Sequence, residues 1–333
     1  MSNVLKSAAL TATVLIGLAG NSAAGEWEIL STNTRADVTA GNVFSLSYAL
    51  YVSMDGRLWD TWDTTHYVRP FRLSIIDSRR NQQFDVRFTD IAFNTDSSGF
   101  ICGEHGVLLE THDWGKNWVQ RYFKEMDRMS FYGLEFANRN VGVLIGSITN
   151  DSVRFGAVVY RTDDGGKTWK KISNVDGTGF SNLSYDMTGE RFIVTALAAV
   201  SISKDKGKSW EYIPLPAENI YRDSDLEGDR GIVIGYDGVM MLSLNAGLTW
   251  SKQDFQSKES LLDLNKYAPG FWYLSGTNGK LWVTKDFGET WEDISPPTSQ
   301  ALLGVQRKGP LLLTWGRNGV IARMDYRDSS LSR

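Results

Sequence analysis

The sequence predicts an all-β fold, a seven-bladed β-propeller of four-stranded antiparallel blades, and three observations lead to that prediction. An eight-residue motif of the form Ser/Thr-x-Asp-x-Gly-x-Thr-Trp recurs five times, with intervals of 51, 41, 40 and 41 residues between its tryptophans. A short Gly-x-x-Gly turn recurs between apolar runs. A period of about 41 residues that holds several short strands is typical of the blades of a propeller.

Composition restricts the class of protein further. The chain has 333 residues, of which 42% are hydrophobic and 22% charged, and its formal net charge is −4. These values exclude a disordered polymer, and the balance of charge argues against a dedicated nucleic-acid binder. Cys102 is the single cysteine and cannot form an internal disulfide. Its apolar neighbours predict a small buried core residue.

The first 24 residues predict a secretory signal peptide. Lys6 supplies a positive charge, and an apolar run of about 13 residues follows it. The small residues Ser22, Ala23 and Ala24 then favour cleavage after Ala24 or Gly25. A membrane anchor is the alternative, but the run is shorter than the roughly 20 residues that span a bilayer. No cysteine lies at the cleavage site, which argues against a lipoprotein. We therefore expect residues 25–333 to form a single propeller domain in the periplasm or a lumen.

The recurring motif predicts a turn between two strands. Its Asp accepts hydrogen bonds from backbone amides ahead of it, its Gly allows a positive φ, and its Trp begins the next strand and buries a large ring. These carboxylates are therefore expected to fold the turn and not to act in catalysis, and a calcium site on them is the alternative. The positions are Asp113, Gly115 and Trp118; Asp164, Gly166 and Trp169; Asp205, Gly207 and Trp210; Asn245, Gly247 and Trp250; and Asp286, Gly288 and Trp291.

Each repeat predicts four strands: two joined by a loop, a third after the Gly-x-x-Gly turn and a fourth after the motif. Residues 26–30 resemble the strand that follows a motif, so we expect them to complete the last blade and close the ring. Residues 38–80 form a degenerate first blade, in which the segment 53–56 is the relic of a turn. Six blades with an N-terminal excursion is the alternative count. The other blades are predicted at 84–122, 130–174, 179–214, 220–255, 260–295 and, without a fourth strand, 302–324.

The motif resembles the Asp-box, or BNR, repeat of sialidases and other β-propellers. Within that group the chain is similar to the photosystem II stability/assembly factor family, most clearly over Phe88–Phe93, Gly99–Gly103, Gly106–Thr111 and Arg161–Trp169. The resemblance covers residues 84–325 and the Trp27 strand, whereas residues 31–83 depart from it. It implies a secreted scaffold that binds other proteins during assembly of a membrane complex, without enzymatic chemistry, and we expect no cofactor.

A glycan-binding or sialidase-like propeller is the alternative function. Sialidases need three arginines that converge on a substrate carboxylate, together with a Tyr–Glu pair and a further acid. The segment Arg69-Pro70-Phe71-Arg72 lacks the order of that family's first arginine motif. Single candidates exist, but such a set arises by chance in a chain of this length: Arg69, Arg72, Arg154, Glu190, Asp225 and Glu227.

Two stretches interrupt the repeat, and irregular additions to a regular scaffold are common places for binding. One is a lengthened hairpin loop at Ser147–Phe155. The other is the first blade, where aromatic residues and arginines, which dominate interface hot spots, predict a surface for a protein partner such as a membrane-complex subunit. The alternative is that its aromatics form the core and its arginines a solvated rim. We expect a monomer without a nucleic-acid partner. The candidate residues are Trp59, Trp62, His66, Tyr67, Arg69, Arg72, Arg79 and Arg80.

Overall fold

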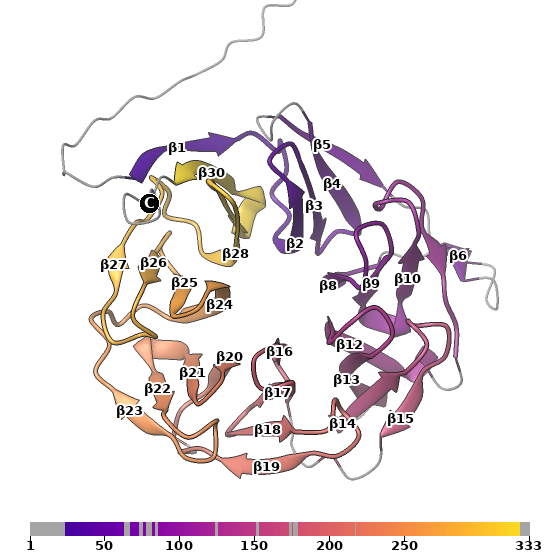
Figure 1. Ribbon diagram of the computed structural model, residues 1–333. Helices are drawn as coiled ribbons and strands as arrows, with labels where there is room; N and C mark the ends of the chain where they lie inside the picture. The colour runs from indigo at the N-terminus through magenta and orange to yellow at the C-terminus, as the bar shows by residue number, and fades with distance from the viewer. Residues whose placement is uncertain are drawn as a thin grey trace, which may run out of the picture.

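The computed structural model describes residues 24–62, 67–72, 76–77, 82–83, 86–123, 126–150, 153–172, 175, 179–216 and 218–326. Seven four-stranded antiparallel sheets stand around a central axis (Figure 1). The predicted all-β, seven-bladed propeller is therefore confirmed, and the six-bladed alternative is wrong. Over these ranges the helices are four 3-10 turns of three residues each, and none of them could cross a membrane.

Each blade is a meander whose first strand lines the axis and whose fourth strand lies at the outer edge of the ring (Figure 1). The first blade contains β2 (Val38–Ser45), β3 (Tyr48–Ser53), β4 (Arg57–Trp62) and β5 (Tyr67–Arg72). The second contains β8 (Phe88–Phe93), β9 (Gly99–Gly103), β10 (Leu108–Thr111) and β11 (Val119–Gln120), and the third contains β12 (Met129–Phe136), β13 (Gly142–Asn150), β14 (Val153–Thr162) and β15 (Lys170–Ile172). The fourth contains β16 (Asn182–Asp186), β17 (Arg191–Ala196), β18 (Ala199–Ser203) and β19 (Glu211–Pro214), and the fifth contains β20 (Tyr221–Glu227), β21 (Arg230–Gly235), β22 (Met240–Ser243) and β23 (Ser251–Gln253). The sixth contains β24 (Leu261–Ala268), β25 (Phe271–Gly276), β26 (Leu281–Thr284) and β27 (Glu292–Asp293). The seventh contains β28 (Leu302–Lys308), β29 (Leu311–Gly316) and β30 (Ile321–Tyr326).

The N-terminal strand completes the seventh blade, as the sequence predicts. β1 (Ala24–Leu30) pairs antiparallel with β30, so that strands from both ends of the chain share one sheet. In this register Trp27 lies opposite Met324. The Trp27 indole N–H also donates to the carbonyl oxygen of Ile294 at 2.8 Å, in the sixth blade. The ring is thus closed by pairing and by a contact to the neighbouring blade.

The first blade is shorter than the predicted span of residues 38–80. It ends with β5 at Arg72. The next two short strands, β6 (Ile76–Asp77) and β7 (Gln82–Gln83), pair with each other in a separate sheet and extend no blade. The repeat pattern could not show this, because the segment contains no Asp motif.

The relic turn of the first blade also has a different place from that of an Asp motif. It joins the second and third strands, which is the position of the Gly-x-x-Gly turn in other blades. The Ser53 hydroxyl donates to Asp55 Oδ1 at 2.7 Å, and Gly56 has a φ of 73°. The turn therefore uses the Asp-motif bond pattern at the position of the other turn.

The core lies between adjacent blades. Middle strands are apolar on both faces, and all six residues of β25 are buried, which explains why such strands are near-continuous hydrophobic runs in the sequence. Trp59, Trp272 and Trp282 are among the largest fully buried side chains. Cys102 is fully buried in the cluster between the second and third blades, as its neighbours predict.

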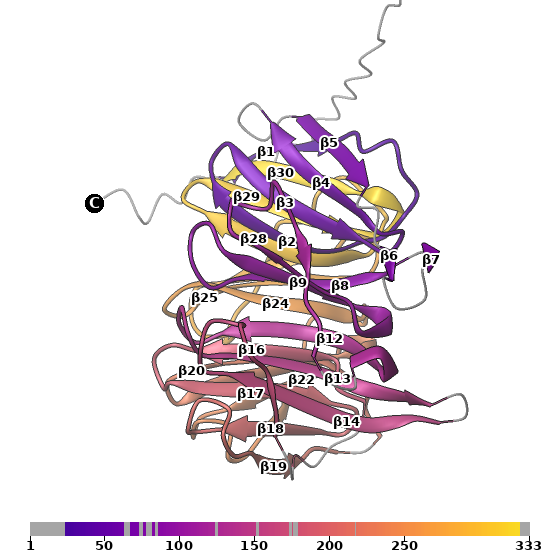
Figure 2. The same ribbon diagram turned by 90° about the vertical axis from the view of Figure 1, so that its right-hand side faces the viewer.

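The two faces of the ring carry different turns. We call the face with the second-to-third-strand turns the Gly-turn face, and the face with the Asp motifs the box face, which is the face seen in Figure 1. The hairpin of β13 and β14, predicted as lengthened, pairs as far as Asn150 and Val153. It projects beyond the other strands of the Gly-turn face (Figure 2).

Candidate functional site

The Asp motifs form hydrogen-bonded turns on the box face. In the second motif, Asp164 Oδ1 accepts the backbone N–H of Thr168 at 2.9 Å and the hydroxyl of Thr162 at 2.8 Å. The Thr162 hydroxyl accepts the N–H of Gly166 at 2.9 Å. The equivalent backbone bonds recur around Asp113, Asp205, Asn245 and Asp286.

These bonds also set the charge of the motif carboxylates. The side-chain and backbone N–H groups of Asn117 hold the pKa of Asp113 below its usual range. At Asp164, burial alone would raise the pKa, but hydrogen bonds from Thr168 outweigh it and the pKa is lowered. Both oxygens of Asp164 are engaged within the turn, because Oδ2 accepts the Thr168 hydroxyl at 2.6 Å. Across the described ranges, no group of three His, Cys, Asp or Glu side chains is arranged to hold a metal ion.

The motif tryptophans pack beneath their own turns. The Trp118 indole N–H donates to the Gly115 carbonyl oxygen at 2.8 Å, and that of Trp291 donates to Gly288 at 3.1 Å. Trp169 is buried, while Trp118, Trp210, Trp250 and Trp291 are half-buried. The motif residues thus form the scaffold, and the candidate site lies elsewhere.

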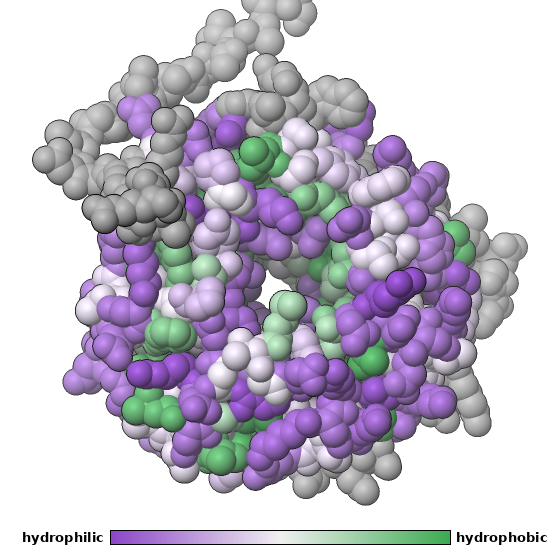
Figure 3. Space-filling view, viewed as in Figure 1, coloured by the Kyte–Doolittle hydropathy of each residue, from purple (hydrophilic) through white to green (hydrophobic). Residues whose placement is uncertain are grey.

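A channel of about 890 Å³ lies on the propeller axis between the first strands of the blades. It opens as a hollow at the centre of the box face (Figure 3). Charged residues from the inner strands line it: the carboxylates Asp90, Glu135, Asp223, Asp225 and Asp263, and the cations Arg222 and Lys266.

Three of these carboxylates hold neighbouring blades together. Each lies beside a register shift in its inner strand, and a bulge of this kind re-aims a side chain. Each Oδ2 accepts a backbone N–H from the inner strand of the next blade: Asp90 from Leu134 at 2.8 Å, Asp223 from Leu264 at 2.8 Å and Asp263 from Val305 at 3.1 Å. A carboxylate has about four acceptor positions, so these bonds leave room for a ligand.

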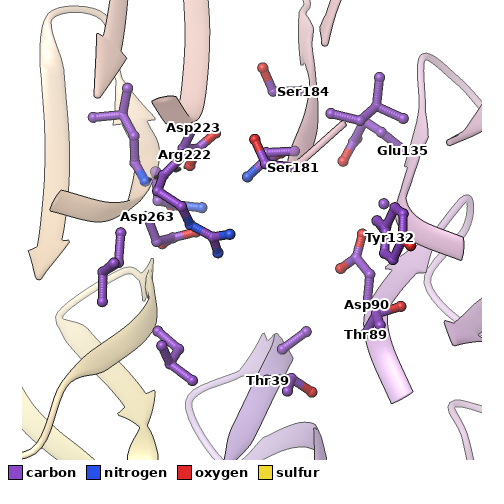
Figure 4. A pocket seen from close by; sticks show the side chains of 18 of the residues that line it. Thr39, Thr89, Asp90, Tyr132, Glu135, Ser181, Ser184, Arg222, Asp223 and Asp263 are labelled. Atoms are coloured by element: carbon purple, nitrogen blue, oxygen red, sulfur yellow. Dashed lines mark hydrogen bonds between the residues drawn. The ribbon is translucent and has the colours of Figure 1, made fainter. Parts of the chain in front are cut away.

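The two sides of the channel differ in charge. Asp90 and Glu135 lie on one side, and Arg222, Asp223 and Asp263 lie on the other (Figure 4). Lys266 is already paired, because its ammonium lies 2.8 Å from Asp225 Oδ1. The Arg222 Nε is buried and has no hydrogen-bond partner among the described residues. The side with Asp90 and Glu135 therefore carries two carboxyl groups that have no paired cation among the described residues.

Burial raises the pKa of the channel carboxylates. The pKa of Glu135 rises to about 8, through burial first and the nearby Asp90 second. Burial likewise raises the pKa of Asp90 to about 6 and that of Asp263 to about 7. At Asp225 burial also raises the pKa, with Lys266 acting against it. The channel thus contains carboxyl groups that change charge near neutral pH.

Glu135→Gln is expected to make the protein about 2 kcal/mol more stable at pH 8, since a shift of one pKa unit corresponds to roughly 1.4 kcal/mol and channel water reduces the effect. The folded state holds the Glu135 proton more tightly than the unfolded chain does, so wild-type stability should fall as pH rises from about 4.5 to 8. The variant should show a shallower fall. Urea unfolding at several pH values measures this, and the exposed Glu289→Gln is the control. Equal pH profiles for wild type and Glu135→Gln would contradict the buried-carboxyl account.

The mouth of the channel on the Gly-turn face has an apolar rim. Four of the residues that line the cavity are large, apolar and exposed: Met54 (38%), Leu197 (49%), Ile220 (49%) and Tyr236 (38%). The exposed Arg317 also lines the cavity, from the second-to-third-strand turn of the seventh blade. Met54, Leu197 and Tyr236 lie in second-to-third-strand turns, and Ile220 lies in the connection that enters β20. We call these four residues the rim. On the box face, by contrast, apolar residues form separate spots (Figure 3).

The structure places the predicted partner-binding residues of the first blade differently. Trp59 is fully buried, and its indole N–H donates to the Ser53 hydroxyl at 3.2 Å, so its side chain belongs to the core and cannot contact a partner. Arg69 is exposed and pairs with Asp60 through two hydrogen bonds, at 3.0 and 2.6 Å. Trp62 and Tyr67 end and begin strands, and Arg72 ends β5. The remaining three, His66, Arg79 and Arg80, lie outside the described residues.

The candidates for a glycosidase do not converge. Asp225 lies in the channel, while Arg69 lies in the fourth strand of the first blade. Glu227 is engaged by the Trp272 indole N–H at 2.8 Å. Glu190 forms an exposed ion pair with Lys206. Asp225 and Glu227 lie on β20, Glu190 in the turn after β16, and Arg69 on β5. The side chains of Arg72 and Arg154 lie outside the described part of the structure.

Sequence reasoning named one channel carboxylate, Asp225, as a glycosidase candidate, and missed the other four, although one signal was available for three of them. An Asp stands two residues after a large side chain at the start of three inner strands, in Phe88-Thr-Asp90, Tyr221-Arg-Asp223 and Leu261-Leu-Asp263. Each Asp precedes the Gly-x-x-Gly turn of its own repeat by 12 or 13 residues. This regular spacing identifies the three Asp residues that accept a backbone N–H from the next blade. Glu135 and Arg222 follow no such pattern in the sequence.

Comparisons with known proteins show which propellers the chain is similar to. The family model of the photosynthesis system II assembly factor YCF48 matches residues 77–176. The photosystem II assembly lipoprotein Ycf48 of Trichormus variabilis is 26% identical over 265 residues, which are 62% of this chain and 74% of that protein. The protein of the same name from Picosynechococcus sp. is 25% identical over 298 residues, which are 72% and 85% of the two chains.

Solved structures agree on the architecture. A structure of YCF48 bound to D1 peptide superposes with a TM-score of 0.72 at 20% identity, covering 94% of this chain and 100% of that one. Virginiamycin B lyase from Staphylococcus aureus also shares the fold, with a TM-score of 0.66 at 10% identity over 90% and 98% of the two chains. At these identities the likeness of the solved structures shows the fold alone. The chain is a BNR-type β-propeller that resembles the photosystem II assembly factor family.

Proposed function

We propose that this chain is a non-catalytic protein-binding factor that assists assembly of a membrane complex from the periplasmic or lumenal side. The observation that carries the proposal is the match, over 62% to 72% of the chain, to proteins named as photosystem II assembly lipoproteins. A neighbour of the same architecture is described as bound to a D1 peptide. An extended peptide segment of a membrane protein is accordingly the partner we assign to this chain.

The docking place that we propose is the mouth of the channel on the Gly-turn face. Exposed apolar side chains at a concave site are suited to bind a partner, and the rim supplies four of them. The channel wall contains charged side chains whose positions are fixed by hydrogen bonds. Three of them accept backbone N–H groups of neighbouring blades: Asp90, Asp223 and Asp263. Carboxylates engaged in this way support binding in preference to catalysis, and the alternative of a sialidase-like enzyme is not favoured.

Secretion through the N-terminal segment is part of the proposal. Residues 1–24 have the charge and apolar pattern of a signal peptide, and we propose residues 25–333 as the propeller domain of the mature protein. The named relatives are lipoproteins. Cys102 is the single cysteine here, and because it is fully buried in β9 it cannot carry a lipid in the folded protein. We therefore expect a secreted protein that is not anchored through a cysteine.

The outer strand of the first blade is the second candidate surface. Arg69 is 62% exposed at its side chain while its guanidinium is fixed by Asp60, so it presents a positioned positive charge. Trp62, Tyr67 and Arg72 flank it in sequence on β4 and β5. This surface remains a prediction for an arginine-dependent contact, separate from the channel.

Affinity purification from the host envelope tests the docking place. The double variant Leu197→Ser/Ile220→Ser removes two rim side chains that are each 49% exposed. Its matched control is Leu244→Ser/Leu248→Ser, which removes exposed leucines of the box face. We expect wild type and control to retain the same membrane-complex subunit, identified by mass spectrometry, and the rim variant to lose it.

The other outcomes are equally informative. A second variant changes four arginines to Ser: Arg69, Arg72, Arg79 and Arg80. If the rim variant retains the subunit and the arginine variant loses it, the binding site lies on the first blade. Glycan-specific binding or sialidase activity of the wild type would overturn the proposal.

A further inference from the structure

The channel has an excess of carboxyl groups over cations on its inner strands. Its inner strands contribute five carboxylates and two cations among the described residues, and one of those cations, Lys266, is paired with Asp225 at 2.8 Å. Arg222 lies on the side of Asp223 and Asp263 (Figure 4), and it acts electrostatically on Asp263. Neither Asp90 nor Glu135, on the opposite side, has an ion pair within the described residues.

Asp90 and Glu135 line the same cavity as the rim residues, but from the second and third blades. A segment that binds here therefore meets two chemistries in order: exposed apolar side chains at the mouth, and uncompensated carboxylates inside. At a pH where Asp90 and Glu135 are ionised, they would repel a carboxylate ligand, and a wholly apolar ligand would leave them desolvated without a partner. A cationic side chain with apolar neighbours satisfies both.

We propose that the channel binds an extended peptide segment whose lysine or arginine side chain enters between Asp90 and Glu135 while its apolar neighbours cover the rim. This inference rests on the proposed function, because it names the chemistry of the partner at the same mouth. The rim residues Leu197, Ile220 and Tyr236 gather on the fourth and fifth blades, where the Tyr236 N–H donates to the Ile220 carbonyl oxygen at 3.0 Å. These three residues form one side of the entrance. The fourth rim residue, Met54, lies apart from them on the first blade.

The hydrogen bonds at the wall leave acceptors for such a cation. Asp90 Oδ1 and Oδ2 each accept one backbone N–H, from Ile91 and Leu134, both at 2.8 Å. Glu135 accepts a backbone hydrogen bond from Phe136. Each carboxylate oxygen retains a further lone pair, and an ammonium group has three donors to share between them. Charge-assisted bonds of this kind are among the strong ones in proteins.

Binding should depend on pH. The charged groups that act on Glu135 are Asp90 on β8, Asp225 on β20 and Lys266 on β24, and burial together with Asp90 favours the protonated carboxyl. A bound cation favours the ionised carboxylate, so binding of the cationic peptide must release protons. The affinity should therefore rise between pH 5.5 and pH 8.5, a range in which lysine stays charged.

Calorimetric titration with end-capped peptides tests the proposal. The probe is acetyl-Gly-Leu-Ala-Lys-Ala-Leu-Gly-amide, and two matched peptides carry norleucine or glutamate in place of the lysine. We expect the lysine peptide to bind about tenfold or more tightly than the norleucine peptide, as a charge-assisted hydrogen bond predicts. Glu135→Gln should remove most of that difference and flatten the pH dependence, and Asp90→Asn should weaken binding in the same direction. Glu289→Gln, exposed on the box face, is the control.

Three results would overturn the proposal: equal affinity for the lysine and norleucine peptides, tighter binding of the glutamate peptide, or no binding of any peptide at millimolar concentration. A lysine preference that survives in Glu135→Gln would also exclude this site for the cation. These outcomes are distinguishable from failure of the proposed function. If the native partner is lost from Leu197→Ser/Ile220→Ser but retained by Glu135→Gln, the docking place stands and only the cationic side chain is wrong.

Discussion

Replacing Gly166 with alanine is expected to destabilise the propeller by about 2–5 kcal/mol, although it adds a single methyl group. Gly166 has a φ of 91°, which costs an L-residue about 1–2 kcal/mol. The new Cβ would also lie 2.2 Å from Phe100 Cζ of the preceding blade. Phe100 is fully buried and packs against Phe136 and Trp169, so its ring has no space to move. Overpacking of this kind costs about 1–3 kcal/mol more.

The neighbouring glycine of the same turn is the matched control. Gly165 also has a positive φ, of 75°, but the nearest atom to its added Cβ, the Arg139 carbonyl oxygen, is 3.0 Å away. Ala246 occupies the equivalent position of another motif with a φ of 64°. Gly165→Ala should therefore cost only about 1 kcal/mol, the backbone part of the effect. Urea unfolding measures both variants, and equal losses would show that the contact between blades contributes nothing.

Leu30→Asp is expected to open the ring and to cost at least 3–5 kcal/mol. Leu30 is 4% exposed and packs in the cluster between the seventh and first blades, opposite Ile321 in the register of β1 and β30. Loss of a buried leucine costs about 2–5 kcal/mol, and a buried carboxyl adds the cost of removing it from water. Because β1 supplies the fourth strand of the seventh blade, that blade should lose its closure first.

The adjacent residue separates this effect from a general sensitivity of β1. Ile29 is 44% exposed and faces the other side of the same strand. Ile29→Asp should change the free energy of unfolding by less than about 1 kcal/mol, as surface substitutions usually do. Amide hydrogen exchange gives the location: protection of β28, β29 and β30 should fall in Leu30→Asp and stay in Ile29→Asp. Similar exchange in the two variants would contradict closure by β1.

The propeller fold was predictable because its turns depend on residues that are close together in the sequence. A turn needs its Asp, its Gly and its hydroxyl within a few residues, so the motif around Asp164 could be recognised without a structure. The closing strand was predictable for the same reason, since Trp27 repeats the tryptophan that ends a motif. The sequence could not show that the residue before the motif glycine also has a positive φ, as Lys206 and Phe287 do, because side chains of several types occupy that position.

The channel was not predictable in this way. Glu135 and Arg222 come from different blades, and only the closed ring brings them to one cavity. The sequence predicts Trp59 as a candidate for a partner surface, but the side chain is buried, and the first blade has no Asp motif to fix the register that buries it. A side chain's direction in a strand depends on register, and a shift of one residue reverses it. A site built from several strands can therefore be recognised only in the tertiary structure, whereas a turn can be recognised in the sequence.

Photo-crosslinking from Tyr236 tests the central claim, that a partner docks at the mouth of the channel on the Gly-turn face. A photoreactive phenylalanine derivative replaces Tyr236, which is 38% exposed at the rim, or in the control Tyr212, which is 45% exposed on the outer strand β19. After irradiation in the host envelope, mass spectrometry identifies the attached protein. The account predicts a crosslink from position 236 to a subunit of a membrane complex and none from position 212. A crosslink to that subunit from position 212 alone would contradict it.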